Sequence, residues 1–233
     1  KDLLRLAICG LCGISVNQLF FFKGLSFTTP VNAAIIHSSS PILVMLFASL
    51  FIKERISWTK AMGVLLGAMG AYLLITTGRQ MDFSSDTSLG NLFIFINIIS
   101  YSFYLVFAKP LMNKYKPITV MSWVFLFGFL FIIPFSASSV TEIKWQFVPT
   151  ELWFSLAYVI FVSTFITYLL TIFALKHLSA TVTGYYIYIQ PVIASLIALF
   201  TAKESLELYK IIAAILIFTG IFMVNKDFKL KRL

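Results

Sequence analysis

Charge is scarce in this sequence. Lysine, arginine, aspartate and glutamate together make up 12% of the 233 residues, whereas 60% of the residues are hydrophobic. Only nine residues are acidic, and each lies at an end of a long apolar segment or between two such segments. Carboxylates are the ligands that hard divalent cations prefer and are common proton carriers within membranes. We therefore expect neither a metal or other cofactor nor a carboxylate relay within the apolar part of the chain.

Several motifs of enzymes are missing as well. The two cysteines, Cys9 and Cys12, form a C-x-x-C pair without a second pair or a nearby histidine, which favours a contact between packed helices over a redox or zinc site. The chain has no G-x-x-x-x-G-K-[ST], no H-E-x-x-H, no G-x-S-x-G and no paired carboxylates. We therefore expect no catalytic residues. An intramembrane enzyme that modifies lipids is the alternative interpretation, and a membrane receptor or scaffold is the third.

What the sequence does have is a series of long apolar segments, which give it a mean hydropathy of +0.94. A transmembrane helix needs about 20 apolar residues. A barrel strand would alternate apolar and polar residues, and these segments do not. The pattern predicts an all-α, polytopic membrane helix bundle with eight transmembrane helices, at residues 5–22, 30–52, 58–77, 90–111, 118–138, 151–175, 181–202 and 206–225.

The basic residues predict the orientation of this bundle. If the eight helices alternate in direction, 13 of the 18 lysines and arginines fall on the side where the first helix begins. Basic residues accumulate in cytoplasmic loops, so we expect a multi-pass protein of the plasma (inner) membrane with both termini in the cytoplasm. The net charge of +9 is spread over loops and a short tail. It therefore does not indicate a nucleic-acid partner; the expected partners are a small-molecule solute and membrane lipid.

An internal repeat relates the two halves of the chain. With an offset of 150 residues and no gap, residues 25–75 and 175–225 share a proline, a Lys-Glu pair, a lysine and a glycine. These residues are Pro41 and Pro191, Lys53-Glu54 and Lys203-Glu204, Lys60 and Lys210, and Gly70 and Gly220. The matched helices start on opposite sides of the membrane, so the repeats are inverted, which is typical of transporters. Helices 90–111 and 118–138 have no partners in the first half, and the register predicts two further helices upstream of residue 1.

These residues resemble a known family. The run Ser38-Ser39-Ser40-Pro41, then Lys53-Glu54-Arg55 and the glycines at 63, 67 and 70, with Gln190-Pro191, Lys203-Glu204 and Gly220 as a second copy, resembles the repeat of the EamA branch of the drug/metabolite transporter superfamily. The resemblance covers residues 5–225. It implies ten helices in two inverted five-helix repeats, alternating access, and transport of metabolites, amino acids or drug-like solutes, often outward.

The resemblance also implies a domain organisation. Residues 1–77 are the last three helices of the first repeat, and residues 90–225 are the five helices of the second. Residues 78–89 form an extracellular or periplasmic linker between the repeats. Residues 226–233 form a basic cytoplasmic tail. The first two helices of the family pattern are not in this sequence.

Polar side chains inside the apolar segments predict the transport path. Several recur on one helix face or at repeat-matched positions, and polar groups inside a bilayer must face other helices or a water-filled cavity. The alternative is that they only hydrogen-bond between packed helices. The aromatic, neutral character of these faces favours a neutral, zwitterionic or aromatic solute over a polyanion. The predicted substrate-binding residues are Asn17, Gln18, His37, Asn97, Tyr101, Tyr168, Tyr185 and Gln190.

Three other features have two interpretations each. His37 is the one mid-helix residue of a type that titrates near neutral pH. It is either a proton site or a neutral ring that is hydrogen-bonded to a neighbouring helix. Pro41 and Pro191 each remove a backbone hydrogen bond in the middle of a helix. The two prolines are either hinges of the transport cycle or residues that only shape their helices. Gly63-x-x-x-Gly67 indicates close packing within the bundle, and less strongly a homodimer face.

Overall fold

The structure is a computed structural model that describes residues 1–77, 85–143, 145–200 and 207–230, and every regular element in these ranges is helical. Some membrane helices are composed of two or three consecutive elements. In chain order the elements are α1 (Asp2–Gly10), η1 (Leu11–Val16), α2 (Asn17–Leu25), α3 (Pro30–His37), α4 (Ser40–Ile52), α5 (Trp58–Thr76), α6 (Ser85–Met112), α7 (Pro117–Glu142), η2 (Trp145–Phe147), α8 (Thr150–Tyr158), η3 (Val159–Ile166), α9 (Thr167–His177), α10 (Ala180–Tyr185), η4 (Tyr186–Tyr188), α11 (Ile189–Phe200) and α12 (Leu208–Leu230).

Within the described ranges, eight helices are long and apolar enough to cross a membrane. They confirm the predicted all-α polytopic bundle. The observed helices differ from the predicted ones mainly in where they begin and end. Helix α6 begins at Ser85, so the last residues of the predicted linker are helical, and α12 continues to Leu230, so most of the predicted basic tail is helical as well.

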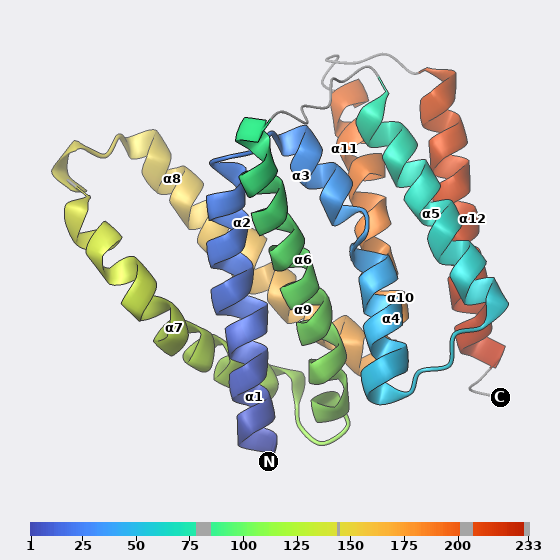
Figure 1. Cartoon of the computed structure of the whole chain (residues 1–233), viewed down its shortest axis with the longest axis horizontal. Coiled ribbons are helices and arrows are strands. Elements are labelled where there is room, and N and C mark those ends of the chain that lie inside the picture. Colours follow the sequence, from blue (N-terminus) through green and yellow to red (C-terminus); the bar gives the residue numbers. More distant parts are fainter. Residues whose placement is uncertain (78–84, 144, 201–206, 231–233) are drawn as a thin grey trace.

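The matched helices of the two repeats run in opposite directions (Figure 1). The α1–α2 helix rises from the end where the N-terminus lies, whereas its repeat partner α8–α9 descends toward that end. The pairs α3–α4 with α10–α11, and α5 with α12, are opposed in the same way. The repeats are therefore inverted. The end of the bundle that holds the N-terminus, the α4–α5, α6–α7 and α9–α10 junctions and the last turn of α12 is called the basic end below, because most lysines and arginines lie there.

Helices α5 and α12 form one of the closest contacts between the repeats. A Cβ atom added at Gly63 would lie 2.9 Å from the Gly220 carbonyl oxygen, and one added at Gly70 would lie 2.7 Å from the Ala213 carbonyl oxygen. Only glycine allows the two backbones to approach this closely. Gly63 and Gly67 are buried within the chain, so this motif packs α5 inside the bundle.

Both repeats interrupt their helices at matched positions. The helix that contains Pro41 breaks at Ser38 and Ser39, and the helix that contains Pro191 tightens into the 3-10 turn η4. The preceding helix of each repeat contains a π segment, which is η1 between α1 and α2 in the first repeat and η3 between α8 and α9 in the second. With the 150-residue offset, η1 corresponds to residues 161–166 of η3. Interrupted helices leave backbone groups unpaired, and in membranes they occur where the backbone is buried in protein or lines a cavity.

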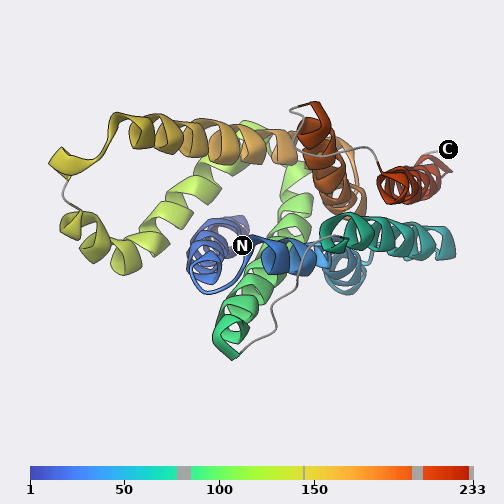
Figure 2. The ribbon, with the colours of Figure 1, turned by 90° about the horizontal axis from the view of Figure 1, so that it is seen from above.

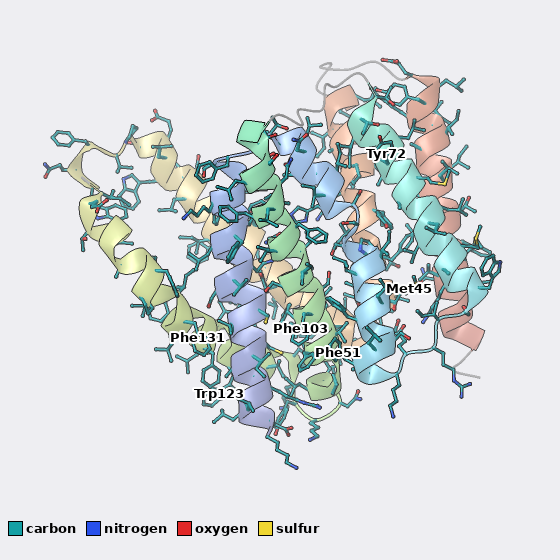
Figure 3. All side chains as sticks on the ribbon, viewed as in Figure 1. Met45, Phe51, Tyr72, Phe103, Trp123 and Phe131 are labelled. Atoms are coloured by element: carbon teal, nitrogen blue, oxygen red, sulfur yellow. The ribbon has the colours of Figure 1, made fainter. Side chains whose placement is uncertain are left out.

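Much of the outer surface is apolar. Phe51, Tyr72, Trp123 and Phe131 lie on it with 37–51% of their surface exposed, as suits contact with lipid (Figure 3). Helices α7 and α8 project together beyond the rest of the bundle (Figure 2), and every residue from 149 to 163 is exposed. Among the eight spans of the described residues, α6 is the best buried and α8–α9 the least.

Candidate functional site

A cavity of about 780 Å³ lies between the two repeats. Eight elements contribute to its wall: α2, α3, α5, α6, η3, α9, η4 and α11. The lining includes Leu25 and Pro30 at the α2–α3 junction and Ile75 near the end of α5, so the cavity extends toward the end of the bundle opposite the basic end. Its volume falls within the range of about 300–1,000 Å³ that is usual for small-molecule sites.

Seven of the eight predicted substrate-binding residues line this cavity: Asn17, Gln18, His37, Asn97, Tyr101, Tyr168 and Gln190. None of the described residues in the lining is aspartate, glutamate, lysine or arginine. Of the two predicted hinge residues, Pro191 lines the cavity, whereas Pro41 is buried in the first turn of α4. The arrangement suits a solute of the size of an amino acid or larger that bears no net charge.

Tyr185 is the exception among the predicted residues. Its ring lies against α5 and α12, and its hydroxyl donates a 3.0 Å hydrogen bond to the Ile217 carbonyl oxygen. It is 1% exposed and is not among the residues that line the cavity. Unlike the other seven predicted residues, Tyr185 therefore does not reach the cavity in this conformation. The 3-10 turn that follows Tyr185 changes the rotation per residue, so the predicted stripe of one α-helical face does not continue through it.

Two predicted residues hold the repeats together across the cavity wall. The Tyr168 hydroxyl in α9 donates to the Gly13 carbonyl oxygen in η1 and also lies 3.1 Å from Asn17 Oδ1. Asn97 Nδ2 in α6 donates a 2.7 Å bond to the Asn17 carbonyl oxygen. Gly13 lies in the π segment η1, and Asn17 is the first residue of α2, directly after it. The Tyr168 hydroxyl and Asn17 Oδ1 are hydrogen-bonded to each other.

Three buried polar atoms in the cavity wall have no hydrogen-bond partner in the described structure: His37 Nε2, Asn97 Oδ1 and the Tyr188 hydroxyl. Asn97 and Tyr188 are each 1% exposed. An unpaired buried polar atom costs about 1–3 kcal/mol, and native proteins rarely leave several together. The three atoms belong to residues of three elements that line the same cavity.

Tyr188 was not among the predicted site residues, although it lies on the polar stripe of its segment. Ser163, Thr164 and Thr171 also line the cavity and were not selected. The polar stripe of the segment from 164 to 171 was a signal for the threonines. Nothing in the sequence marked Ser163, which faces the cavity from the π segment.

The basic end of the bundle is closed beneath the cavity. Val44, Val106, Leu175 and Ala180 from α4, α6, α9 and α10 are fully buried there. Ser40 and Ser102 hydroxyl oxygens lie 3.3 Å apart between α4 and α6. None of these six residues is among those that line the cavity.

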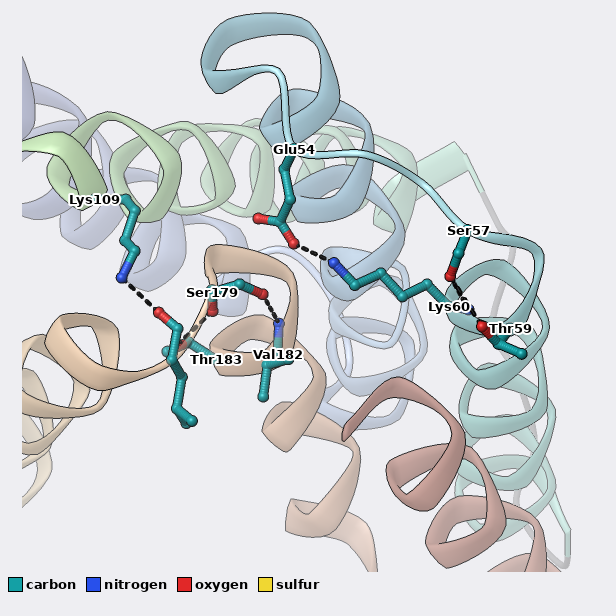
Figure 4. Close-up of polar contacts among 9 residues, drawn as sticks. Glu54, Ser57, Thr59, Lys60, Lys109, Ser179, Val182 and Thr183 are labelled. Atoms are coloured by element: carbon teal, nitrogen blue, oxygen red, sulfur yellow. Dashed lines mark hydrogen bonds and ion pairs between the residues drawn. The ribbon is translucent and has the colours of Figure 1, made fainter. Parts of the chain in front are cut away.

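Charged groups brace this closed end (Figure 4). Lys109 Nζ donates 2.7 Å hydrogen bonds to the carbonyl oxygens of Leu175 and Leu178, which ties α6 to the end of α9. Lys60 Nζ lies 2.6 Å from Glu54 Oε1 across the α4–α5 junction. A lysine at a helix C-terminus satisfies open carbonyl groups and interacts favourably with the helix dipole.

Comparisons with known proteins agree with this architecture. A transporter of Archaeoglobus fulgidus, named "Uncharacterized transporter", is 26% identical over 225 residues, which are 97% of this chain and 77% of that protein. A protein of Streptantibioticus cattleyicolor named "Probable terminal-alkyne amino-acid exporter" is 20% identical over 226 residues, 97% of this chain and 74% of that protein. A solved crystal structure with 18% sequence identity has the same fold, with a TM-score of 0.77 over 97% of this chain and 78% of the other.

The family comparison covers both repeats. The EamA-like transporter family matches residues 1–76 and 88–226. The two matched ranges meet near the predicted boundary between the repeats. With eight apolar spans, inverted halves and a cavity between them, the chain is a multi-pass membrane transporter and not an enzyme, and it belongs to the EamA-like transporter family.

Proposed function

We propose that the protein exports small, uncharged or zwitterionic solutes, such as amino acids, other metabolites or drug-like molecules, by alternating access. The observation that carries the proposal is the cavity between inverted repeats, with an uncharged lining and three polar atoms that have no partner among the described residues. A charged solute would find no oppositely charged side chain in this wall and would lose its hydration at high cost.

The proposed orientation places the basic end in the cytoplasm of a cell bounded by a plasma (inner) membrane. Basic residues favour the cytoplasmic side, and the structure places the chain start and the last turn of α12 at this end. The cavity then faces outward, and the buried apolar contacts beneath it form the closed inner side. A relative named as an amino-acid exporter supports the outward direction.

We also propose that the functional transporter has ten helices. By the repeat register, α6 and α7 would have counterparts that precede the first helix of this sequence. Helix α6 of the second repeat packs against α2 and α4 of the first, and α7 packs against α1. The inverted counterparts would cover α8–α9 and α10–α11, and the exposed residues 149–163 lie on that face.

Pro41 and Pro191 are proposed as hinges of the transport cycle. Both lie directly after a matched break in their helix, and such breaks allow two halves of a helix to move separately. An intramembrane lipid-modifying enzyme receives no comparable support. No group of three or more metal-binding side chains occurs among the described residues.

Flux measurements test the proposal. Purified protein in proteoliposomes that contain radiolabelled neutral amino acids should release them faster than liposomes without protein. Tyr101→Ala and Gln190→Ala should weaken solute binding and leave membrane insertion unchanged, because both residues line the cavity and neither change adds charge. Tyr72→Ala, on the outer surface, is the control. Equal losses with Tyr72→Ala and Tyr101→Ala, or no flux of any neutral amino acid or drug, would contradict the proposed path.

A further inference from the structure

Tyr188 lies in the broken helix of the second repeat and is held in place by its neighbours. Its ring meets the Tyr185 ring edge to face, with centroids 5.0 Å apart and an interplanar angle of 83°. Tyr185 is anchored to α12 by its bond to the Ile217 carbonyl oxygen. A Cβ atom added at Gly67 would lie 2.5 Å from Tyr188 Cδ2, so the glycine provides the space that the ring occupies. The position of the Tyr188 hydroxyl is therefore determined by α5, α10 and α12.

Asn97 is fixed in a comparable way from α6. Its amide nitrogen donates to the Asn17 carbonyl oxygen, and this bond determines which end of the amide is the oxygen. The reversed amide would place two acceptor oxygens against each other. Asn97 Oδ1 is consequently the end without a partner, and it can only accept a hydrogen bond.

The two free atoms are chemically complementary. The Tyr188 hydroxyl is a donor that needs an acceptor, and Asn97 Oδ1 is an acceptor that needs a donor. The repeat partner of Tyr188 is Ser38, which also lines the cavity, but its hydroxyl already donates to the Ile35 carbonyl oxygen at 2.6 Å. The second repeat alone therefore supplies a free hydroxyl at this depth of the described cavity.

We propose that Tyr188 and Asn97 determine specificity, with the Tyr188 hydroxyl donating to an acceptor of the solute and Asn97 Oδ1 accepting from one of its N–H or O–H groups. This inference rests on the proposed transport function and names the chemistry that the same cavity selects. Tyr185 and Gly67 are positioning residues, which act through the Tyr188 ring. A purely apolar molecule of the same size fits the volume but leaves both buried atoms unpaired, and it binds more weakly for that reason.

Calorimetric titration of the detergent-solubilised protein with two probes of similar shape tests the inference. 3-Phenylpropionamide carries a carbonyl acceptor and N–H donors, whereas propylbenzene carries neither. The wild-type protein should bind the amide at least about ten-fold more tightly than the hydrocarbon, and Tyr188→Phe should remove about ten-fold of this preference. Tyr185→Phe should reduce it in part and leave the affinity for propylbenzene unchanged.

Tyr186→Phe is the matched control, because Tyr186 lies on the same turn, is 42% exposed and does not line the cavity. This variant should keep the full preference. Melting temperatures of all variants report folding separately from binding. The absence of any amide preference in the wild-type protein, or an equal loss with Tyr186→Phe, overturns the inference. Neither result bears on flux in proteoliposomes, so transport and this selectivity fail independently.

Discussion

Lys60 Nζ lies 2.6 Å from Glu54 Oε1, and the two side chains are only 3% and 15% exposed. The pair joins the end of α4 to the first turn of α5. Lys53, next to Glu54, adopts the left-handed conformation that ends α4, with φ at 55°. This geometry gives a physical reason for a motif that recurs in both halves of the sequence, a Lys-Glu pair followed by a lysine six residues after the glutamate. The second glutamate, Glu204, lies outside the described residues.

Removing one partner of this pair should destabilise the protein. Lys60→Met leaves the partly buried Glu54 carboxylate without its ammonium partner, and such a loss costs up to about 3–5 kcal/mol where the pair is fully buried. The melting temperature in detergent should therefore fall clearly. Lys116→Met, at an exposed position, should leave it within about a degree. The double variant Glu54→Met with Lys60→Met should recover most of the loss, and a double variant as unstable as Lys60→Met would show that the pair is not the cause.

The Lys109 bonds to Leu175 and Leu178 should hold the basic end closed. Lys109→Met removes both bonds and opens the α6–α9 contact. In a variant without Cys9 and Cys12, a cysteine at Ala180 should then react several-fold faster with a membrane-impermeant thiol reagent applied at the proposed cytoplasmic side. Lys176→Met removes a charge from the same end of α9 without breaking either bond, and should not change the rate. Equal rates in the Lys109 and Lys176 variants would mean that the lysine does not brace this end.

Glycine packing between α5 and α12 provides a test of the repeat interface. Gly63→Leu places a side chain where a Cβ atom would already lie 2.9 Å from the Gly220 carbonyl oxygen. Overpacking of this kind costs about 1–3 kcal/mol and more where backbones must separate. The yield of monodisperse protein should fall. Met69→Leu, on the exposed face of the same helix, should behave as the wild type does. A tolerated Gly63→Leu would show that the two helices pack differently in the membrane.

Hydropathy and the repeat were sufficient to predict the helix count and the opposed directions of the halves. They did not predict which polar residues line the cavity and which hydrogen-bond to a neighbouring helix. Gln18 and Tyr168 occupy matched positions of the two repeats, yet the Tyr168 hydroxyl bonds to the Gly13 carbonyl oxygen in the π segment and to Asn17 Oδ1. A π segment has no clear sequence signal, and it changes which residues share a face. The same reason explains why Tyr185, and not Tyr188, was selected from a segment that contains a 3-10 turn.

The exposed apolar surface was also hard to place from sequence. Lipid tails are as apolar as the side chains in a helix contact, so a leucine-rich or phenylalanine-rich segment does not reveal whether it faces lipid or protein. The segment 118–138 and the segment 151–175 are similarly hydrophobic to the well-packed α6. Only the folded arrangement shows that residues 149–163 make so few contacts within the chain.

This exposed segment leads to a prediction about the upstream helices. If two helices precede this sequence and cover α8 and η3, the extended protein should be more monodisperse in detergent than residues 1–233 alone, because it buries an apolar face. Cysteine pairs between the added helices and residues 152–163 should cross-link. Equal dispersity and equal transport by both forms would contradict the ten-helix proposal.

His37→Gln tests whether protons take part in transport. His37 lines the cavity, its Nε2 atom has no partner among the described residues, and its ring meets Phe21 edge to face with centroids 5.8 Å apart. The other titratable groups in the described cavity wall are Tyr101, Tyr168 and Tyr188, which do not change charge near neutral pH. Histidine is therefore the one side chain type in this wall that, in its unperturbed form, changes charge between about pH 5 and 8.

The substitution by glutamine keeps a hydrogen-bonding side chain and removes the titration. His37→Gln should flatten any pH dependence of transport between about pH 5 and 8, with solute binding retained. The control is His177→Gln, at the exposed end of α9, which should keep the wild-type profile. Because no carboxylate lines the described wall, a proton on His37 would be balanced only by the solute or by a group in the proposed upstream helices. An unchanged pH profile in His37→Gln would leave His37 as a packing residue and indicate either a facilitator or coupling through those helices.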